Sequence, residues 1–77
     1  MSARAEPDEN YRLMVEKIIE RRKQVGMTQV QLAEAIQTEQ SQISKYERHE
    51  RIIGLKDFAR ICRSLKIDPR KLLDLLE

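Results

Sequence analysis

Apolar residues recur along this chain at the spacing of short amphipathic helices. In the first such segment, residues 9–25, they fall at Tyr11, Met14, Val15, Ile18, Ile19 and Val25. Recurrence close to i, i+3, i+4 and i+7 is typical of one face of a helix. Asp8 or Pro7 suits its start, and Gly26 suits the position just past its end.

A second and shorter helix is predicted within MTQVQLAEAIQ. Thr28 is a favourable N-cap residue, and Gln31 three positions later completes the pattern of a capping box. The apolar side of this helix is expected to hold Val30, Leu32, Ala33 and Ile36. Such a helix would be only about two and a half turns long.

Thr38 and Glu39 interrupt the pattern, and helical spacing resumes from Gln40 to about Arg48. The sequence QSQISKYERHER, residues 40–51, contains this helix and the start of the following loop. The inward side of the helix is expected to carry Ile43, Tyr46 and Glu47. A helix that only supports a fold usually has a wider apolar stripe. The narrow stripe therefore suggests that the outer face contacts something else.

Two further helices complete the chain. Residues 49–54 read as a loop, and the fourth helix is predicted from Leu55 to about Leu65. Asp68 followed by Pro69 is a strong helix start, because Asp caps the helix and Pro suits its first position. Five short helices joined by tight turns, with no competing strand pattern, predict a compact all-α fold.

Length and composition agree with one small domain. The chain has 77 residues, of which 40% are hydrophobic and 36% charged, a globular balance. We expect a flexible N-terminal tail at residues 1–8 and a single domain at residues 9–77. The net charge of +2 indicates little by itself, so the distribution of charge must decide which partner is favoured.

Several classes of function find no support in the sequence. A single Cys and a single His offer neither an internal disulfide nor a metal cluster. No nucleophile–histidine pairing, glycine-rich phosphate loop or paired carboxylates suggest an enzyme, so no catalytic residue, metal or cofactor is expected. No apolar run approaches the roughly 18 residues of a membrane span, and the start lacks a signal peptide. A cytoplasmic location is expected.

The second and third helices together have the form of a helix-turn-helix. At about 100° per residue, placing Ile43 toward the core puts Ser41, Lys45 and Arg48 near the opposite side, with Ser44 at the edge. Gln40 projects from the helix N-terminus. Gln can pair with adenine, Lys or Arg with guanine, and Ser with either, so this face suits the edges of DNA bases.

Residues 18–76 resemble the Cro/repressor-type helix-turn-helix domains, the xenobiotic-response-element family of small phage and bacterial regulators. The resemblance is carried by RRKQVGMTQVQLAEAI, then SQISKYER, then LKDFARICRSLKIDPRKLL. It implies a five-helix lambda-repressor-like fold. It also implies a regulator that binds double-stranded DNA sequence-specifically, as a homodimer on a palindromic operator, with residues 40–48 as its recognition helix.

The resemblance assigns roles to individual positions. Residues implied in base contact are Gln40, Ser41, Ser44 and Lys45. Those implied in phosphate contact are Gln29, Arg48, Arg51 and Lys56. Arg22 and Glu47 match a partly buried salt bridge that joins the first helix to the third.

Three positions depart from the family pattern. Gln37 and His49 stand where Gly is usual, at turns that tend to need a left-handed backbone. His is among the residues enriched in that conformation, whereas Gln37 suggests a different turn or a longer second helix. Glu39 occupies a position where Ser or Thr commonly caps the third helix, so Thr38 is expected to cap instead.

The last helix carries more leucine than one small core readily uses. Leu72, Leu73, Leu75 and Leu76 cover over half of its circumference. The excess suggests a subunit contact, together with Ile52 or Ile53, although the cluster could simply close the core. The alternative function is a protein-interaction module, such as an antitoxin with the same fold. A tight complex without DNA would favour it.

Overall fold

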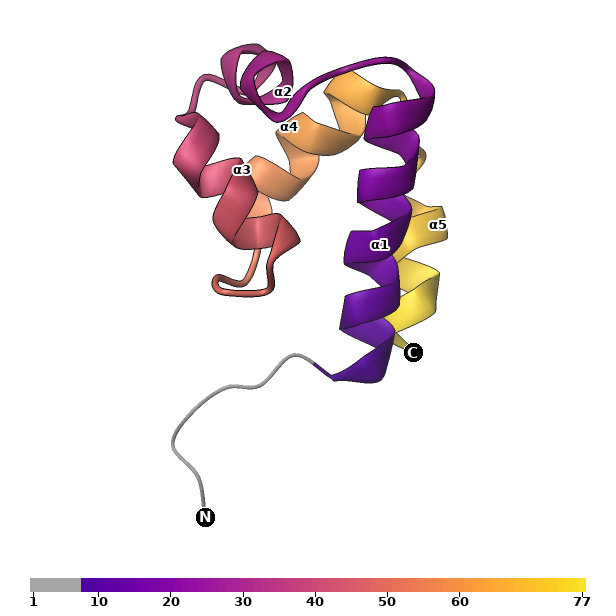
Figure 1. Ribbon diagram of the computed structural model, residues 1–77. Coiled ribbons are helices and arrows are strands. Elements are labelled where there is room, and N and C mark those ends of the chain that lie inside the picture. Colours follow the sequence, from indigo (N-terminus) through magenta and orange to yellow (C-terminus); the bar gives the residue numbers. More distant parts are fainter. Residues whose placement is uncertain (1–7) are drawn as a thin grey trace.

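A computed structural model describes residues 8–77, and that part of the chain is helical without strands. The elements are α1 (Glu9–Gln24), α2 (Gln29–Ala35), α3 (Gln40–Glu47), α4 (Leu55–Leu65), α5 (Pro69–Leu73) and a final 3₁₀ turn, η1 (Asp74–Leu76). The fold is the compact five-helix, lambda-repressor-like domain expected from the sequence (Figure 1).

The helices are arranged around one core, to which α1 to α5 all contribute buried residues. In Figure 1, α2 and α3 lie to one side of α1, and α5 runs along its other side. The end of the chain returns to the beginning of α1, where Asn10 Nδ2 donates to the Glu77 carbonyl at 3.2 Å. This leaves the α2–α3 pair on a face of its own.

Three helix starts have the side-chain caps that the sequence predicts. The Asp8 carboxylate accepts the Tyr11 N–H at 2.8 Å. Thr28 and Gln31 form a reciprocal capping box at 3.0 and 2.9 Å. The Asp68 carboxylate accepts the Arg70 N–H, with Pro69 at the first helical position. Each such cap stabilises its helix by about 1 kcal/mol.

The expected tail falls mostly outside the residues described. Residues 1–7 lie beyond them, and Asp8 is the N-cap of α1. At the other end of α1, Gly26 has a φ of +78° and follows the helix as predicted, although the helix itself ends at Gln24.

Both turns that lack the usual Gly nevertheless adopt the left-handed backbone. Gln37 has φ = 61° and His49 has φ = 62°. The expectation that Gln37 would change the turn or lengthen α2 is therefore wrong: α2 ends at Ala35. Hydrogen bonds from the Thr38 N–H to Ala33 and from the Glu50 N–H to Lys45 close the two turns, at 2.8 Å each. These bonds hold residues that would otherwise avoid positive φ.

Two local predictions need correction. Thr38 does not cap α3, since the N-cap residue is Glu39 and it makes no side-chain capping bond. The Thr38 backbone is drawn instead into the turn that closes α2. The last helix also does not run unbroken to Leu76, because its final turn tightens into η1. Such tightening is common where terminal carbonyls lack partners.

The core unites residues from α1 to α5. Its buried apolar members are Met14, Val15, Ile18, Leu32, Ala33, Ile36, Ile43, Tyr46, Phe58, Ile61, Cys62, Leu65 and Leu72. Val25, Val30 and Leu55, which the pattern assigns to apolar sides, are 43%, 51% and 84% exposed. They stand at helix ends, where periodicity continues but no neighbouring helix covers the side chain.

Candidate nucleic-acid interface

The third helix presents a polar outer face while two apolar residues hold it to the core. Ile43 and Tyr46 are buried, at 1% and 4% exposure. Ser41, Lys45 and Arg48 are exposed, as the helical wheel predicts, and Gln40 is exposed at the N-terminus. Ser44 is half-buried, in keeping with its edge position.

A buried ion pair fixes the base of this helix to α1. Arg22 Nε donates to Glu47 Oε2 at 2.7 Å, and Nη2 donates to Oε1 at 3.0 Å. Arg22 Nη1 also donates to the Met27 carbonyl at 2.8 Å. The two charged side chains are only 9% and 11% exposed. The predicted salt bridge is thus confirmed, in the bidentate geometry that Arg favours with carboxylates.

The second helix joins the same network through Gln29. Its Nε2 donates to Glu47 Oε1 at 2.9 Å, and its Oε1 accepts from Gln40 Nε2 at 2.6 Å. Gln29 and Gln40, predicted to contact phosphate and bases respectively, therefore lie side by side. Because an amide nitrogen has two N–H groups, each Gln keeps one donor free of these bonds.

A second set of hydrogen bonds ties α3 to α4 and to the loop between them. The Tyr46 hydroxyl donates to Asp57 Oδ2 at 2.5 Å and accepts from Gln42 Nε2 at 2.9 Å. Gln42 Oε1 in turn accepts from Arg51 Nη1 at 3.5 Å. Burial raises the pKa of Tyr46, and its hydrogen bond to the neighbouring Asp57 carboxylate raises it further.

The loop is also held from α1. The Tyr11 hydroxyl accepts the Ile53 N–H at 2.9 Å, and burial raises the pKa of this tyrosine. His49 Nε2 lies 3.7 Å from Glu16 Oε2. The segment that follows α3 is thus held by hydrogen bonds to α1 as well as to α3.

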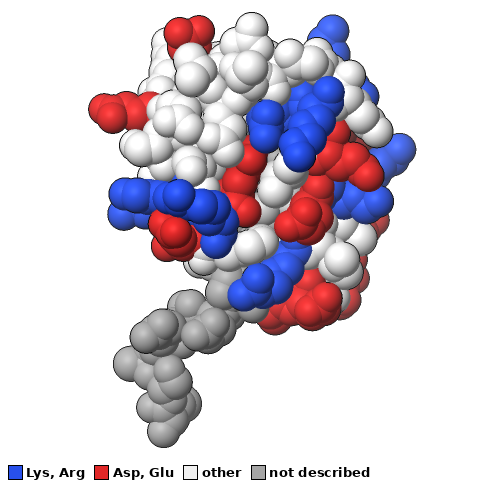
Figure 2. Space-filling view, viewed as in Figure 1, with Lys and Arg blue, Asp and Glu red and all other residues white. Residues whose placement is uncertain are grey.

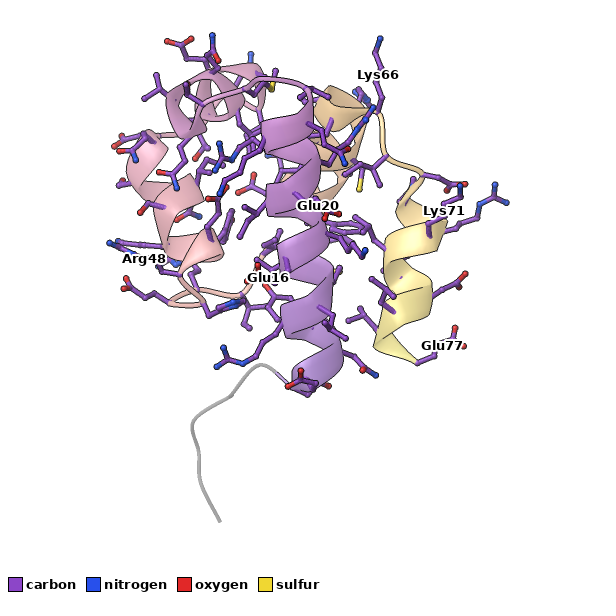
Figure 3. All side chains as sticks on the ribbon, turned by 45° about the vertical axis from the view of Figure 1, so that its right-hand side comes forward. Glu16, Glu20, Arg48, Lys66, Lys71 and Glu77 are labelled. Carbon is purple, nitrogen blue, oxygen red and sulfur yellow. The ribbon has the colours of Figure 1, made fainter. Side chains whose placement is uncertain are left out.

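The cations predicted to contact phosphate border the polar face. Arg48 projects from the end of α3 (Figure 3) and pairs with Glu50 at 3.2 Å, where both side chains are more than half exposed. Arg51 and Lys56 are exposed in the loop and in the first turn of α4. Over α2 and α3, Figure 2 shows mainly uncharged atoms, with cationic and acidic side chains interspersed elsewhere on this view.

Sequence reasoning did not assign a role to Gln42 or Asp57. The sequence does indicate that Tyr46 needs a polar partner, because a buried tyrosine hydroxyl usually makes a hydrogen bond. Choosing that partner required the packing of α4 against α3, which spacing along the chain does not give. Gln42 could not be assigned until the Tyr46 hydroxyl and Arg51 were located.

Within residues 8–77, no group of three or more His, Cys, Asp or Glu is placed to hold a metal ion. None of the helices in that range is both long enough and apolar enough to cross a membrane.

Comparison with known families gives one assignment that agrees with this geometry. Residues 18–72 match the family model described as helix-turn-helix, a range that begins in α1 and ends in α5. Comparison with curated proteins gives no match. Because the family model spans most of the chain, the protein belongs to the helix-turn-helix family of Cro/repressor type, a family of DNA-binding transcriptional regulators.

Proposed function

We propose that the protein binds a palindromic operator as a homodimer, with α3 of each subunit in a major groove. The observation that carries this proposal is the exposed set Gln40, Ser41 and Lys45 on a helix anchored by buried Ile43 and Tyr46. Residues near the start of a recognition helix are those that reach base edges. Ser44 contributes at the rim of the same face.

The free donors and acceptors of Gln40 suit adenine. One N–H of its amide is bonded to Gln29, which leaves a second N–H and the carbonyl oxygen. Adenine presents the N7 acceptor and the N6 donor, so Gln40 can still pair with it through two bonds. The contact to Gln29 would hold the amide in the required orientation.

The surrounding residues provide contacts to the DNA backbone. The remaining N–H of Gln29, at the N-terminus of α2, is suited to a phosphate oxygen. Further cations for phosphate contact are the exposed side chains of Arg48, Arg51 and Lys56. The pair between Arg48 and Glu50 is exposed and contributes little, so Arg48 can exchange it for a phosphate.

A second copy of the chain is the expected partner at an apolar surface on the α4–α5 side. This dimer patch consists of Leu55, Leu73 and Leu76, exposed by 84%, 45% and 39%. Leu55 and Leu73 both line two adjoining hollows whose floor includes Phe58. Leu72 is buried in the core. The leucines of the last helix that the core leaves largely exposed are therefore Leu73 and Leu76.

The DNA-reading proposal is tested by comparing specific and non-specific binding. Fluorescence anisotropy would measure the Kd of Gln40→Ala and Lys45→Ala on a duplex enriched from a random pool and on a scrambled duplex. Loss of a base contact should weaken specific binding by about 1–3 kcal/mol and non-specific binding much less. Gln24→Ala, an exposed residue at the end of α1, is the control. Equal losses on both duplexes would remove these residues as base readers.

A further inference from the structure

Behind the proposed phosphate contact Arg51, a series of hydrogen bonds links α4, α3 and the loop that follows α3. It runs from Asp57 through Tyr46 and Gln42 to Arg51, with donor–acceptor distances of 2.5, 2.9 and 3.5 Å. All but the terminal bond to Arg51 are partly buried. Here it is called the Asp57–Arg51 chain.

The direction of each bond follows from the group at the buried end. A carboxylate only accepts, so Asp57 takes the single hydroxyl proton of Tyr46. The Tyr46 oxygen is then an acceptor, and the Gln42 amide must turn its N–H₂ toward it. That orientation leaves the Gln42 carbonyl oxygen facing Arg51. A flipped amide would set its oxygen against the hydroxyl oxygen and lose the bond.

We propose that Gln42 is a positioning residue for DNA backbone contact: with Tyr46 and Asp57 behind it, it holds the Arg51 guanidinium ready for a phosphate. The inference rests on the proposed role of Arg51 in DNA binding. Only one of the five guanidinium N–H groups is directed to Gln42, and Arg51 is otherwise exposed.

Preorganisation explains how the Asp57–Arg51 chain would strengthen DNA binding. A free arginine side chain loses rotamer freedom when it binds, and that loss opposes association. A guanidinium already directed by Gln42 loses less. The long 3.5 Å contact can guide the side chain without withholding it from a stronger, charged acceptor.

The test is a double-mutant cycle between Gln42 and Arg51, with Kd measured by anisotropy on enriched and scrambled duplexes over a salt series. Gln42→Met should raise Kd about two- to tenfold on both duplexes. In the Arg51→Ala background it should have no further effect. Arg51→Ala itself should reduce the slope of log K against log salt by about 0.9. Tyr46→Phe, which keeps the buried ring, should behave like Gln42→Met, and Gln24→Met is the matched control.

Each outcome separates the inference from the function on which it rests. If the unmodified protein shows no salt-dependent binding to any duplex, the DNA-binding proposal fails, and this inference with it. If Arg51→Ala leaves the slope of log K against log salt unchanged, Arg51 does not contact phosphate. The Asp57–Arg51 chain then has no phosphate-binding group to position. If Arg51→Ala lowers the slope but Gln42→Met retains its full effect without Arg51, the positioning role alone is overturned.

Discussion

Replacement of Arg22 by Met gives the sharpest test of how α3 is held in place. The substitution keeps an unbranched side chain of similar reach but removes the cation from Glu47, whose side chain is only 11% exposed. Three hydrogen bonds are lost, two to the Glu47 carboxylate and one to the Met27 carbonyl. The carboxylate is left to the single amide donor of Gln29.

The size of the expected effect follows from burial. Removing one partner of a buried ion pair costs about 3–5 kcal/mol, because the other charge stays desolvated. A domain of this length is stable by only about 4–12 kcal/mol in total. The loss should lower Tm by at least about 12 °C, taking about 4 °C or more per kcal/mol for a domain of this size.

Urea unfolding followed by circular dichroism measures this free energy. Glu47→Leu should cost a similar amount, whereas the double variant Arg22→Met/Glu47→Leu should lose less than either single variant, since no unpaired charge remains. Lys17→Met is the control, because its pair with Glu20 is 3.8 Å long and about 60% exposed. It should change stability by less than about 1 kcal/mol. Losses below about 1 kcal/mol for Arg22→Met, or additive losses in the double variant, would refute the reasoning.

Three further predictions concern the dimer patch, a turn and a tyrosine. Leu55→Glu should leave the monomer folded, because Leu55 is 84% exposed, but should shift the sedimentation coefficient from dimer to monomer; an unchanged dimer would exclude this patch. Gln37→Gly should raise the unfolding free energy in urea by about 0.5–1 kcal/mol, because Gly relieves a φ of 61°; a loss would mean that the Gln side chain matters more than the backbone. A pKa of Tyr46 raised above 10 in the folded state contributes stability that is complete below pH 10 and is lost as pH rises further, so Tyr46→Phe should flatten that alkaline loss in pH-dependent melting; an identical profile would contradict the burial of this hydroxyl.

Local signals in the sequence account for most of the helix boundaries. Thr28 with Gln31, and Asp68 with Pro69, mark helix starts through bonds between neighbours in the chain. Such bonds depend on residues a few positions apart, so they can be predicted without the tertiary fold. The outer face of α3 was likewise predictable, because one buried residue, Ile43, fixes the orientation of a short helix.

Features that depend on packing between helices were not predictable in this way. Periodicity could not show that Leu55 would be left uncovered, because the spacing of apolar residues does not show whether another helix covers the start of α4. The left-handed backbone at Gln37 depends on the hydrogen bond from the Thr38 N–H to the Ala33 carbonyl, and not on the residue type alone. The contact between Tyr46 and Asp57 needed the relative placement of α3 and α4.

The most direct test of the central proposal is selection of duplexes by the full chain from a random DNA pool. Two copies of α3 in successive major grooves predict an enriched inverted repeat whose half-site centres lie about 10 base pairs apart. Under the same conditions, the Gln40→Ala/Lys45→Ala double variant should lose enrichment within each half-site. A pool from which the unmodified protein enriches no motif, or only an unrepeated one, would contradict sequence reading by a homodimer.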